Sequence, residues 1–171
     1  MAVLNIDYAS YTALAVVNLQ SLAIDSTDPF AGWQSARVAN HVTKALDYEV
    51  IIDLSTAATA PASDAAAYVY VVPWVTTDGG TTWLQGANFG TVTLPSATDA
   101  LASISDPNSM RGPIGISYKI ISQRLNLWFT IASLCDGVVP DGWSLAIRNN
   151  TGAALGTGCV VAYRSITNTS V

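Results

Sequence analysis

Several stretches of this sequence alternate apolar and polar residues with a period of two, and no other feature restricts the fold as much. Apolar side chains recur at every second position of residues 48–54, 116–120, 125–131 and 143–147. Successive side chains of a strand point to opposite faces, so each stretch predicts a β-strand with one face in a core. We find no convincing long helix, and the predicted fold class is therefore all-β.

Turn residues separate the predicted strands. Asp78, Gly79 and Gly80 supply the positive φ angles of a tight hairpin between residues 74–77 and 81–83. Many short strands joined by Gly and Pro turns imply an antiparallel β-sandwich or barrel of about eight strands. The predicted strands lie near residues 12–19, 46–54, 67–76, 81–84, 90–94, 114–121, 125–132, 143–148 and 159–166.

The stretch 68–72 is apolar at every position. This composition predicts a strand that is covered on both faces. Pro73 follows it and cannot donate a backbone hydrogen bond, so we expect it to end the strand or to place it at a sheet edge.

Residues 1–36 differ in composition from the rest of the chain, since they are rich in Ala, Leu and Val and contain no cation. We interpret them as an N-terminal arm or edge segment ahead of a β-sandwich domain of residues 37–171. Periodicity leaves open whether the arm holds a strand or a short helix. An apolar arm suits contact with a neighbouring subunit. We expect residues 1–24 to be needed for binding and dispensable for folding.

The low charge excludes several classes of protein. Charged residues make up 11% of the chain, hydrophobic residues make up 50%, and the formal net charge is -5. A disordered chain needs the reverse balance, and nucleic-acid binding needs clustered cations. The apolar run of residues 11–24 is shorter than the roughly 20 residues that span a bilayer. No basic residue precedes Arg37, so no secretory signal is expected. A surface this poor in charge favours an oligomer or docking on a large assembly.

The residue types of catalytic and metal sites are scarce. His41 is the single histidine, and no Gly-x-Ser-x-Gly motif accompanies it, so we interpret it as an isolated polar residue. Cys135 and Cys159 match no zinc spacing and are expected to be free, mostly buried thiols. Asp25 and Asp28 are interpreted as a solvated turn rather than as cation ligands. We therefore expect no enzymatic activity, no metal and no cofactor.

The tryptophans are the more informative set. Trp74 and Trp83 flank the predicted hairpin at matching distances, so we expect them to pair across it. Trp128 points away from the apolar side chains of residues 125–129. Exposure of that face would make Trp128 a contact residue for a sugar or a protein, and coverage by a second sheet or subunit would make it a core residue. We favour coverage.

Four segments resemble a family of virion structural proteins of tailed bacteriophages. Residues 69–83 read VYVVPWVTTDGGTTW and are similar to the family's hairpin, and residues 111–116, RGPIGI, are similar to its following strand. Residues 138–155 read VVPDGWSLAIRNNTGAAL and resemble a further element of the family. Residues 160–166 read VVAYRSI and resemble its closing strand. This chain departs from the family at two positions, because Ser144 and Ser165 stand where the family has Gly. Upstream, residues 33–40 followed by residues 48–54 are similar to the family's first shared block.

The resemblance implies a jelly-roll-like β-sandwich in the virion. The implied function is that of a head decoration, or cement, protein on the outer surface of the capsid, made in the bacterial cytoplasm. Its partners would be the major capsid protein and neighbouring copies of itself, and analogy favours a homotrimer. A tail or neck component, and a carbohydrate-binding host-adhesion module, are the alternatives. The predicted contact residues are Leu14, Val16, Val17, Leu19, Leu22, Trp33, Trp74, Trp83 and Trp128.

Overall fold

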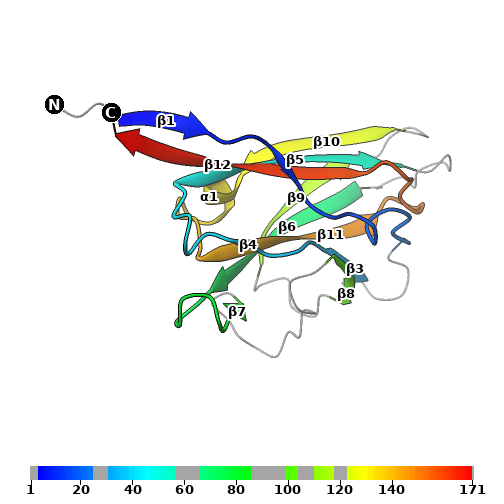
Figure 1. Cartoon of the computed structure of the whole chain (residues 1–171). Helices are drawn as coiled ribbons and strands as arrows, with labels where there is room; N and C mark the ends of the chain where they lie inside the picture. Colours follow the sequence, from blue (N-terminus) through cyan, green and yellow to red (C-terminus); the bar gives the residue numbers. More distant parts are fainter. Residues whose placement is uncertain are drawn as a thin grey trace.

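The structure is a computed structural model, in which two antiparallel sheets pack face to face (Figure 1). It describes residues 4–24, 31–56, 66–85, 99–103, 110–117 and 123–170. The first sheet contains β1 (Leu4–Tyr8), β2 (Thr12–Ala13), β5 (Asp47–Ser55), β10 (Arg124–Thr130) and β12 (Val160–Ser170). The second contains β3 (Ala31–Gln34), β4 (Val38–Ala39), β6 (Ala66–Val75), β7 (Leu84–Gln85), β8 (Ala100–Ser103), β9 (Arg111–Ser117) and β11 (Gly142–Asn150). A short helix, α1 (Ile131–Leu134), follows β10.

The strand order is that of a jelly roll. The first sheet runs β1-β12-β5-β10, and β2 also pairs with β12. The second runs β7-β6-β11-β3-β8, with β4 paired to β11 and β9 to β6. Let β1 and β2 share the first strand position, β3 and β4 the second, and β7 and β9 the fifth, with β8 added beside β3. The sheets then read 1-8-3-6 and 2-7-4-5. This is the interleaved order of a two-sheet jelly roll. The predicted all-β, jelly-roll-like sandwich is confirmed.

The core lies between the sheets, on the faces that the alternation predicts. Every second side chain of β5 from Tyr48 to Leu54 is buried, while Asp53 and Ser55 stay partly exposed. β11 is buried on both faces along most of its length. Edge-to-face aromatic contacts join the two layers. The ring of Trp143 on β11 lies 5.4 Å from Tyr48 on β5 and 5.3 Å from Tyr163 on β12, between centroids. The buried residues of β5 and β11 that contribute to this core are Tyr48, Val50, Ile52, Leu54, Trp143, Leu145 and Ile147.

The strand β6 is buried on both faces, as its uniform apolar composition predicts. Val69 and Val71 point into the core, whereas Tyr70 and Val72 belong to a second buried cluster on the other face. The expectation for Pro73 was wrong, because β6 continues to Val75. Pro73 lies between the end of the β9 pairing and the start of the β7 pairing, where its missing N–H group leaves no ladder partner unsatisfied.

The predicted tight hairpin is a wider loop. The pairing of β6 with β7 ends at Val75 and Leu84, so residues 76–83 form the connection. Asp78 accepts a hydrogen bond from the backbone N–H of Thr82 at 2.7 Å, and the Thr76 hydroxyl accepts one from Gly80 at 2.8 Å. Side-chain acceptors thus replace the ladder bonds that a tight hairpin would make.

Other predicted strands are shortened or lie outside the described residues. The predicted strand at 12–19 is reduced to β2, and residues 17–21 form a turn. The predicted strand at 90–94 and the end of the one at 114–121 lie outside the described residues.

The division predicted at residue 36 is not seen. β1 lies at a sheet edge, but β3 lies inside the second sheet, between β11 and β8. Leu19 and Leu22 belong to the core that both sheets share. Loss of one buried Leu side chain typically costs about 2–5 kcal/mol, so from the structure we expect deletion of residues 1–24 to destabilise the fold.

We predict that Gly32→Ala strongly destabilises the protein. A Cβ atom at this position of β3 would lie 2.4 Å from the backbone carbonyl oxygen of Ile147 on β11, and backbone cannot yield as a side chain does. Overpacking of this kind typically costs about 1–3 kcal/mol. Thermal unfolding followed by circular dichroism should therefore show a clearly lower Tm.

The matched control is Gly115→Ala on the edge strand β9. Its added Cβ would meet only the Tyr68 ring, at 3.6 Å, which is ordinary van der Waals contact. An equal loss of stability in both variants would contradict the close approach of β3 and β11.

Candidate interaction surface

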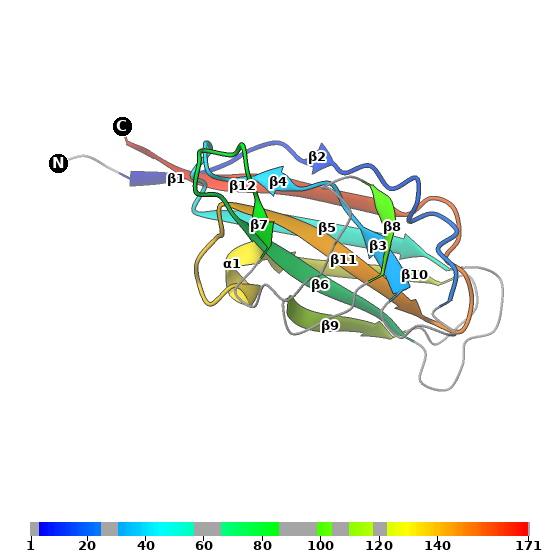
Figure 2. The same ribbon diagram turned by 90° about the horizontal axis from the view of Figure 1, so that it is seen from below.

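Exposed aromatic and apolar side chains gather on the first sheet, on the face that points away from the second sheet. We call this surface the outer face. It includes Trp128, which is 63% exposed, and Val160. Figure 2, seen from below, shows β12, β5 and β10 side by side in one layer, with β6 and β11 in the other. The second sheet therefore does not cover Trp128, and the expectation of coverage is not met within the chain.

A row of apolar side chains crosses the outer face. The strand registers place Trp128 opposite Ile51, Ile51 opposite Ala162, and Ala162 opposite Ala13. Directly paired residues of neighbouring strands lie on the same face. The row therefore consists of one large ring on β10 beside a strip of smaller side chains.

An ion pair lies on one side of this row. Glu49 is paired with Arg164, with 2.9 Å between the carboxylate Oε1 and the guanidinium Nη2. Glu49 is only 5% exposed, and it also accepts a hydrogen bond from the Tyr11 hydroxyl. The nearby Trp128 indole helps to lower the pKa of the Glu49 carboxyl group. The Arg164 guanidinium lies over the rings of Tyr8 and Tyr11, 4.7 and 4.8 Å from their centroids. This network fixes Glu49 and Arg164 in place.

The network shifts the pKa values of Glu49 and Tyr11 in opposite directions. The hydrogen bond from Arg164 lowers the pKa of Glu49, although burial opposes that effect. The hydrogen bond to the Glu49 carboxylate raises the pKa of Tyr11. Glu49 is therefore charged and Tyr11 neutral throughout the neutral pH range.

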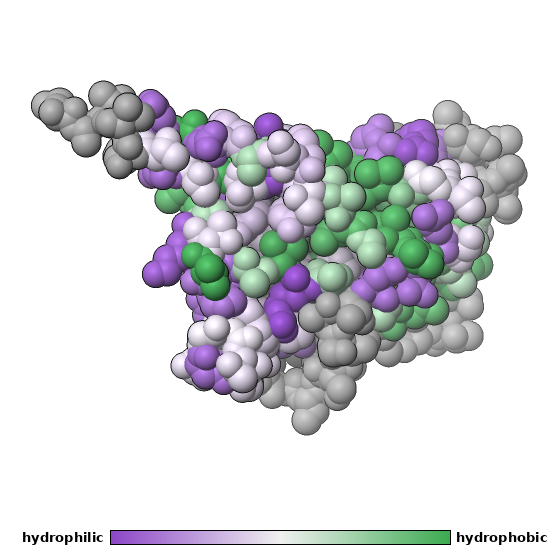
Figure 3. Space-filling model, viewed as in Figure 1, coloured by the Kyte–Doolittle hydropathy of each residue, from purple (hydrophilic) through white to green (hydrophobic). Residues whose placement is uncertain are grey.

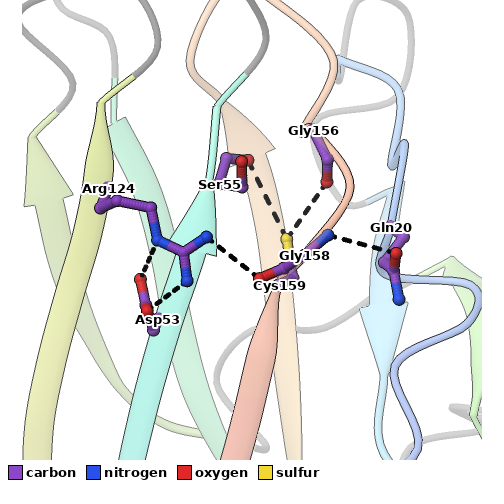
Figure 4. Close-up of polar contacts among 7 residues, drawn as sticks. All are labelled: Gln20, Asp53, Ser55, Arg124, Gly156, Gly158 and Cys159. Atoms are coloured by element: carbon purple, nitrogen blue, oxygen red, sulfur yellow. Dashed lines mark hydrogen bonds and ion pairs between the residues drawn. The ribbon is translucent and has the colours of Figure 1, made fainter.

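A second ion pair lies on the other side of the row (Figure 4). Arg124 donates two hydrogen bonds to Asp53, one of them from Nε at 2.8 Å, and a third to the carbonyl of Gly158. Asn126 pairs with Asp53 across the two strands. Both carboxylates of this part of the face thus have a guanidinium partner, and the face carries no excess charge there.

The chain ends form a projecting ribbon beside the outer face. Pairing of β12 with β5 stops at Ile166, but pairing with β1 continues to residue 170. Residues 4–8 and 166–170, which we call the terminal ribbon, therefore extend beyond the sandwich, with Leu4 and Ser170 paired at its far end (Figure 1). Ile6 is 62% exposed and Tyr8 is 51% exposed.

Four predicted contact residues belong to the interior of the chain itself. Burial inside one domain and burial by a partner give the same apolar sequence signal, so composition alone could not separate them. Trp33 is fully buried, and Trp74 donates its indole hydrogen bond to buried Ser144 at 2.9 Å. As a correction, the interior residues are Leu19, Leu22, Trp33 and Trp74.

The remaining predicted residues lie nearer the surface. Leu14 and Val16 are half-buried against the core, while Val17 is 75% exposed. Figure 3 shows hydrophobic surface on the same side of the molecule that the segment 9–24 crosses in Figure 1.

Trp74 and Trp83 do not form the expected cross-strand pair, but both contact the same side chain. Both rings lie beside the guanidinium of Arg37, at 5.4 and 4.0 Å, and the ring of His41 packs edge-on against Trp83. This cluster holds the loop 76–83 against the body of the domain. His41 therefore serves packing in this structure.

Sequence reasoning missed Tyr8, Tyr11, Glu49 and Arg164 as members of the surface. One signal was present, since Glu49 is the single glutamate of the chain and lies at an outward position of a strongly alternating strand. Its partners come from residues far away in sequence, and only the register brings them together.

Other kinds of site are not supported within the described part of the chain. It contains no group of three or more His, Cys, Asp and Glu side chains that could hold a metal ion. No helix described by the structure is long and apolar enough to cross a membrane. Cys135 and Cys159 are free thiols, as predicted, and burial raises the pKa of Cys135 to about 11. A pocket of about 200 Å³ beside Tyr48 and Tyr163 is smaller than common ligand sites.

Comparisons with known proteins give no family for this chain. No protein-family model matches it, and neither a curated protein nor a solved structure matches it. Any function must therefore be argued from the residues and the geometry above.

We predict that Glu49 makes stability depend on pH in the acid range. Its pKa in the folded protein is below the unfolded value of about 4.3. Its contribution is therefore present above pH 4.3 and is lost as the pH falls through the folded pKa. Glu49→Gln should lower stability at pH 7 by about 1.5–3 kcal/mol, the range for a hydrogen bond to a charged group. The difference in Tm from the wild type should shrink towards pH 3.

Asp136→Asn is the matched control for this titration. Its carboxylate is exposed and lies 3.7 Å from Arg111, and such surface pairs contribute about 0–1 kcal/mol. A wild-type minus Glu49→Gln difference that stays constant from pH 3 to pH 7 would contradict the role assigned to Glu49.

Proposed function

We propose that this chain is a bacteriophage virion structural protein, a decoration protein that binds the outer surface of the major capsid protein shell and stabilises it. The observation that carries this proposal is the terminal ribbon. Decoration requires a folded body that stays outside the shell and an element that reaches a neighbouring subunit. The sandwich would serve as the folded body, and the terminal ribbon would serve as the element that reaches the neighbouring subunit.

The ribbon has the properties of a docking element. A two-stranded ribbon is marginally stable by itself in water. Its exposed side chains include Ile6 and Tyr8, and Asp7 is the single charged residue of the two stretches that form it. The free edge of β1 also offers unpaired backbone groups to a partner strand. Contact with a neighbouring subunit would bury the apolar side chains and would provide hydrogen-bond partners for the backbone groups of this edge.

The fold and the sequence motifs support the same proposal. Jelly rolls include viral capsid domains as well as lectins, so the fold supports the class by analogy. The segments that resemble the phage family coincide with β6, β9, β11 and β12 and with the turns beside them. The low charge of the whole chain suits a protein whose surface is partly covered by an assembly.

Stabilisation of the shell would follow from mass action. A protein that binds the assembled shell and not its separated subunits shifts the equilibrium towards assembly. Many copies, each with a modest interface, give a large total effect. Neighbouring copies would meet around a symmetry axis of the shell, where a homotrimer is the proposed arrangement.

Binding to shells tests the proposal. Purified protein is mixed with expanded shells of the phage that encodes it, assembled without this protein, and co-sedimentation and shell melting are followed. We expect saturable binding and a higher melting temperature of the shell. Absence of binding to shells, or binding to isolated tails instead, would overturn the decoration function.

Deletion of residues 1–8 tests the role of the ribbon. This deletion removes β1 and leaves Leu19 and Leu22 in the core, so the Tm of the free protein should change little. Affinity for shells should fall at least tenfold, or about 1.4 kcal/mol. Val42→Ser, which changes an exposed apolar residue of another loop, is the control and should bind like the wild type. Unchanged affinity of the deletion variant would remove the ribbon from the account.

A further inference from the structure

We propose that the outer face around Trp128 is a binding site for a neutral carbohydrate. The site consists of the exposed indole, the strip of Ile51 and Ala162 beside it, and the Glu49–Arg164 and Asp53–Arg124 pairs on its two sides. This activity would be separate from shell binding, which the proposal above assigns to the terminal ribbon.

The position of Trp128 is the first argument. A single exposed apolar residue needs no explanation, but this ring continues into a row of apolar side chains, with Ile51 directly opposite it. The ring also lies near Glu49, which is buried and bound to Tyr11 and Arg164. A flat aromatic surface suits the C–H-rich face of a pyranose ring, because both are apolar.

The shape of the face is the second argument. Ile51 and Ala162 follow Trp128 in register across β5 and β12. Neighbouring strands are about 4.8 Å apart, so this strip extends about 10 Å from β10 to β12. The large ring beside smaller side chains forms a step, against which a short oligosaccharide can lie with one apolar face on the indole.

The charges are the third argument, and they select a neutral ligand. Glu49 has Arg164 and Asp53 has Arg124, so the two carboxylates are matched by two guanidinium groups. A nucleic acid or an anionic polymer would need cations without such partners. The partly exposed Asp53 carboxylate and Arg124 guanidinium retain further acceptor and donor positions, which suit the vicinal hydroxyl groups of a sugar. Asn126 adds an exposed amide beside Asp53.

The test uses the full chain and defined oligosaccharides. Maltohexaose, cellohexaose and chitohexaose serve as neutral probes, and oligogalacturonate serves as the anionic probe. Binding is measured by isothermal titration calorimetry and by the change in tryptophan fluorescence. We expect saturable binding of at least one neutral probe and none of the anionic one. Failure of all the neutral probes, or preferential binding of the anionic one, would overturn the inference.

Two substitutions connect the binding to this face. Trp128→Ala should weaken binding at least tenfold, whereas Trp128→Phe should retain most of it because the aromatic face remains. Val138→Ala removes another exposed apolar side chain away from the face and should bind like the wild type. Since Trp128 is exposed, all three variants should keep the wild-type fold, which circular dichroism and Tm check.

The same variants separate a sugar site from a protein interface. If Trp128→Ala binds the probe as the wild type does, the inference is wrong. It is also wrong if the substitution changes the oligomeric state in analytical ultracentrifugation, or abolishes shell binding. Those results would assign the outer face to another protein chain. Shell binding that fails while sugar binding persists would overturn the decoration function alone.

Discussion

The contact of Trp143 with Tyr48 and Tyr163 between the sheets is the constraint on which the rest of the structure depends. It joins β11 of one sheet to β5 and β12 of the other. Because side chains alternate along a strand, inward Tyr48 places Glu49 outward, and inward Tyr163 places Arg164 outward. The register then pairs these two charged residues directly. A slip of one residue would exchange the faces of a whole strand, so packing in the core determines the chemistry of the surface.

The sequence allowed the strands to be predicted where one side chain in two is buried. The central strands β5, β6, β11 and β12 were predicted within a few residues, because alternation or uniform burial is a local signal. The loop 76–83 was predicted less well. There, hydrogen bonds from Asp78 and Thr76 to backbone N–H groups decide the conformation, and the Asp-Gly pair suggested a tighter turn.

The surface could be predicted only in part, for two physical reasons. Apolar composition does not distinguish burial in the chain's own core from burial by a partner, so Trp33 and Leu19 were assigned to the wrong environment. Contacts between distant strands depend on register, which a single sequence does not specify. For that reason Trp128 was identified as a residue of interest, whereas the nearby Glu49–Arg164 pair was not.

We propose two roles for two parts of one sheet. The ribbon formed by β1 and the end of β12 would reach a neighbouring capsid subunit, and the outer face would stay available beyond the shell. Hydrogen exchange of backbone amides, compared between free protein and protein bound to expanded shells, tests this most directly. The account predicts slower exchange on the shell for residues 4–8 and 166–170 and unchanged exchange for the outward residues of β10. Unchanged exchange in the ribbon, with protection confined to β10 and β5, would contradict it.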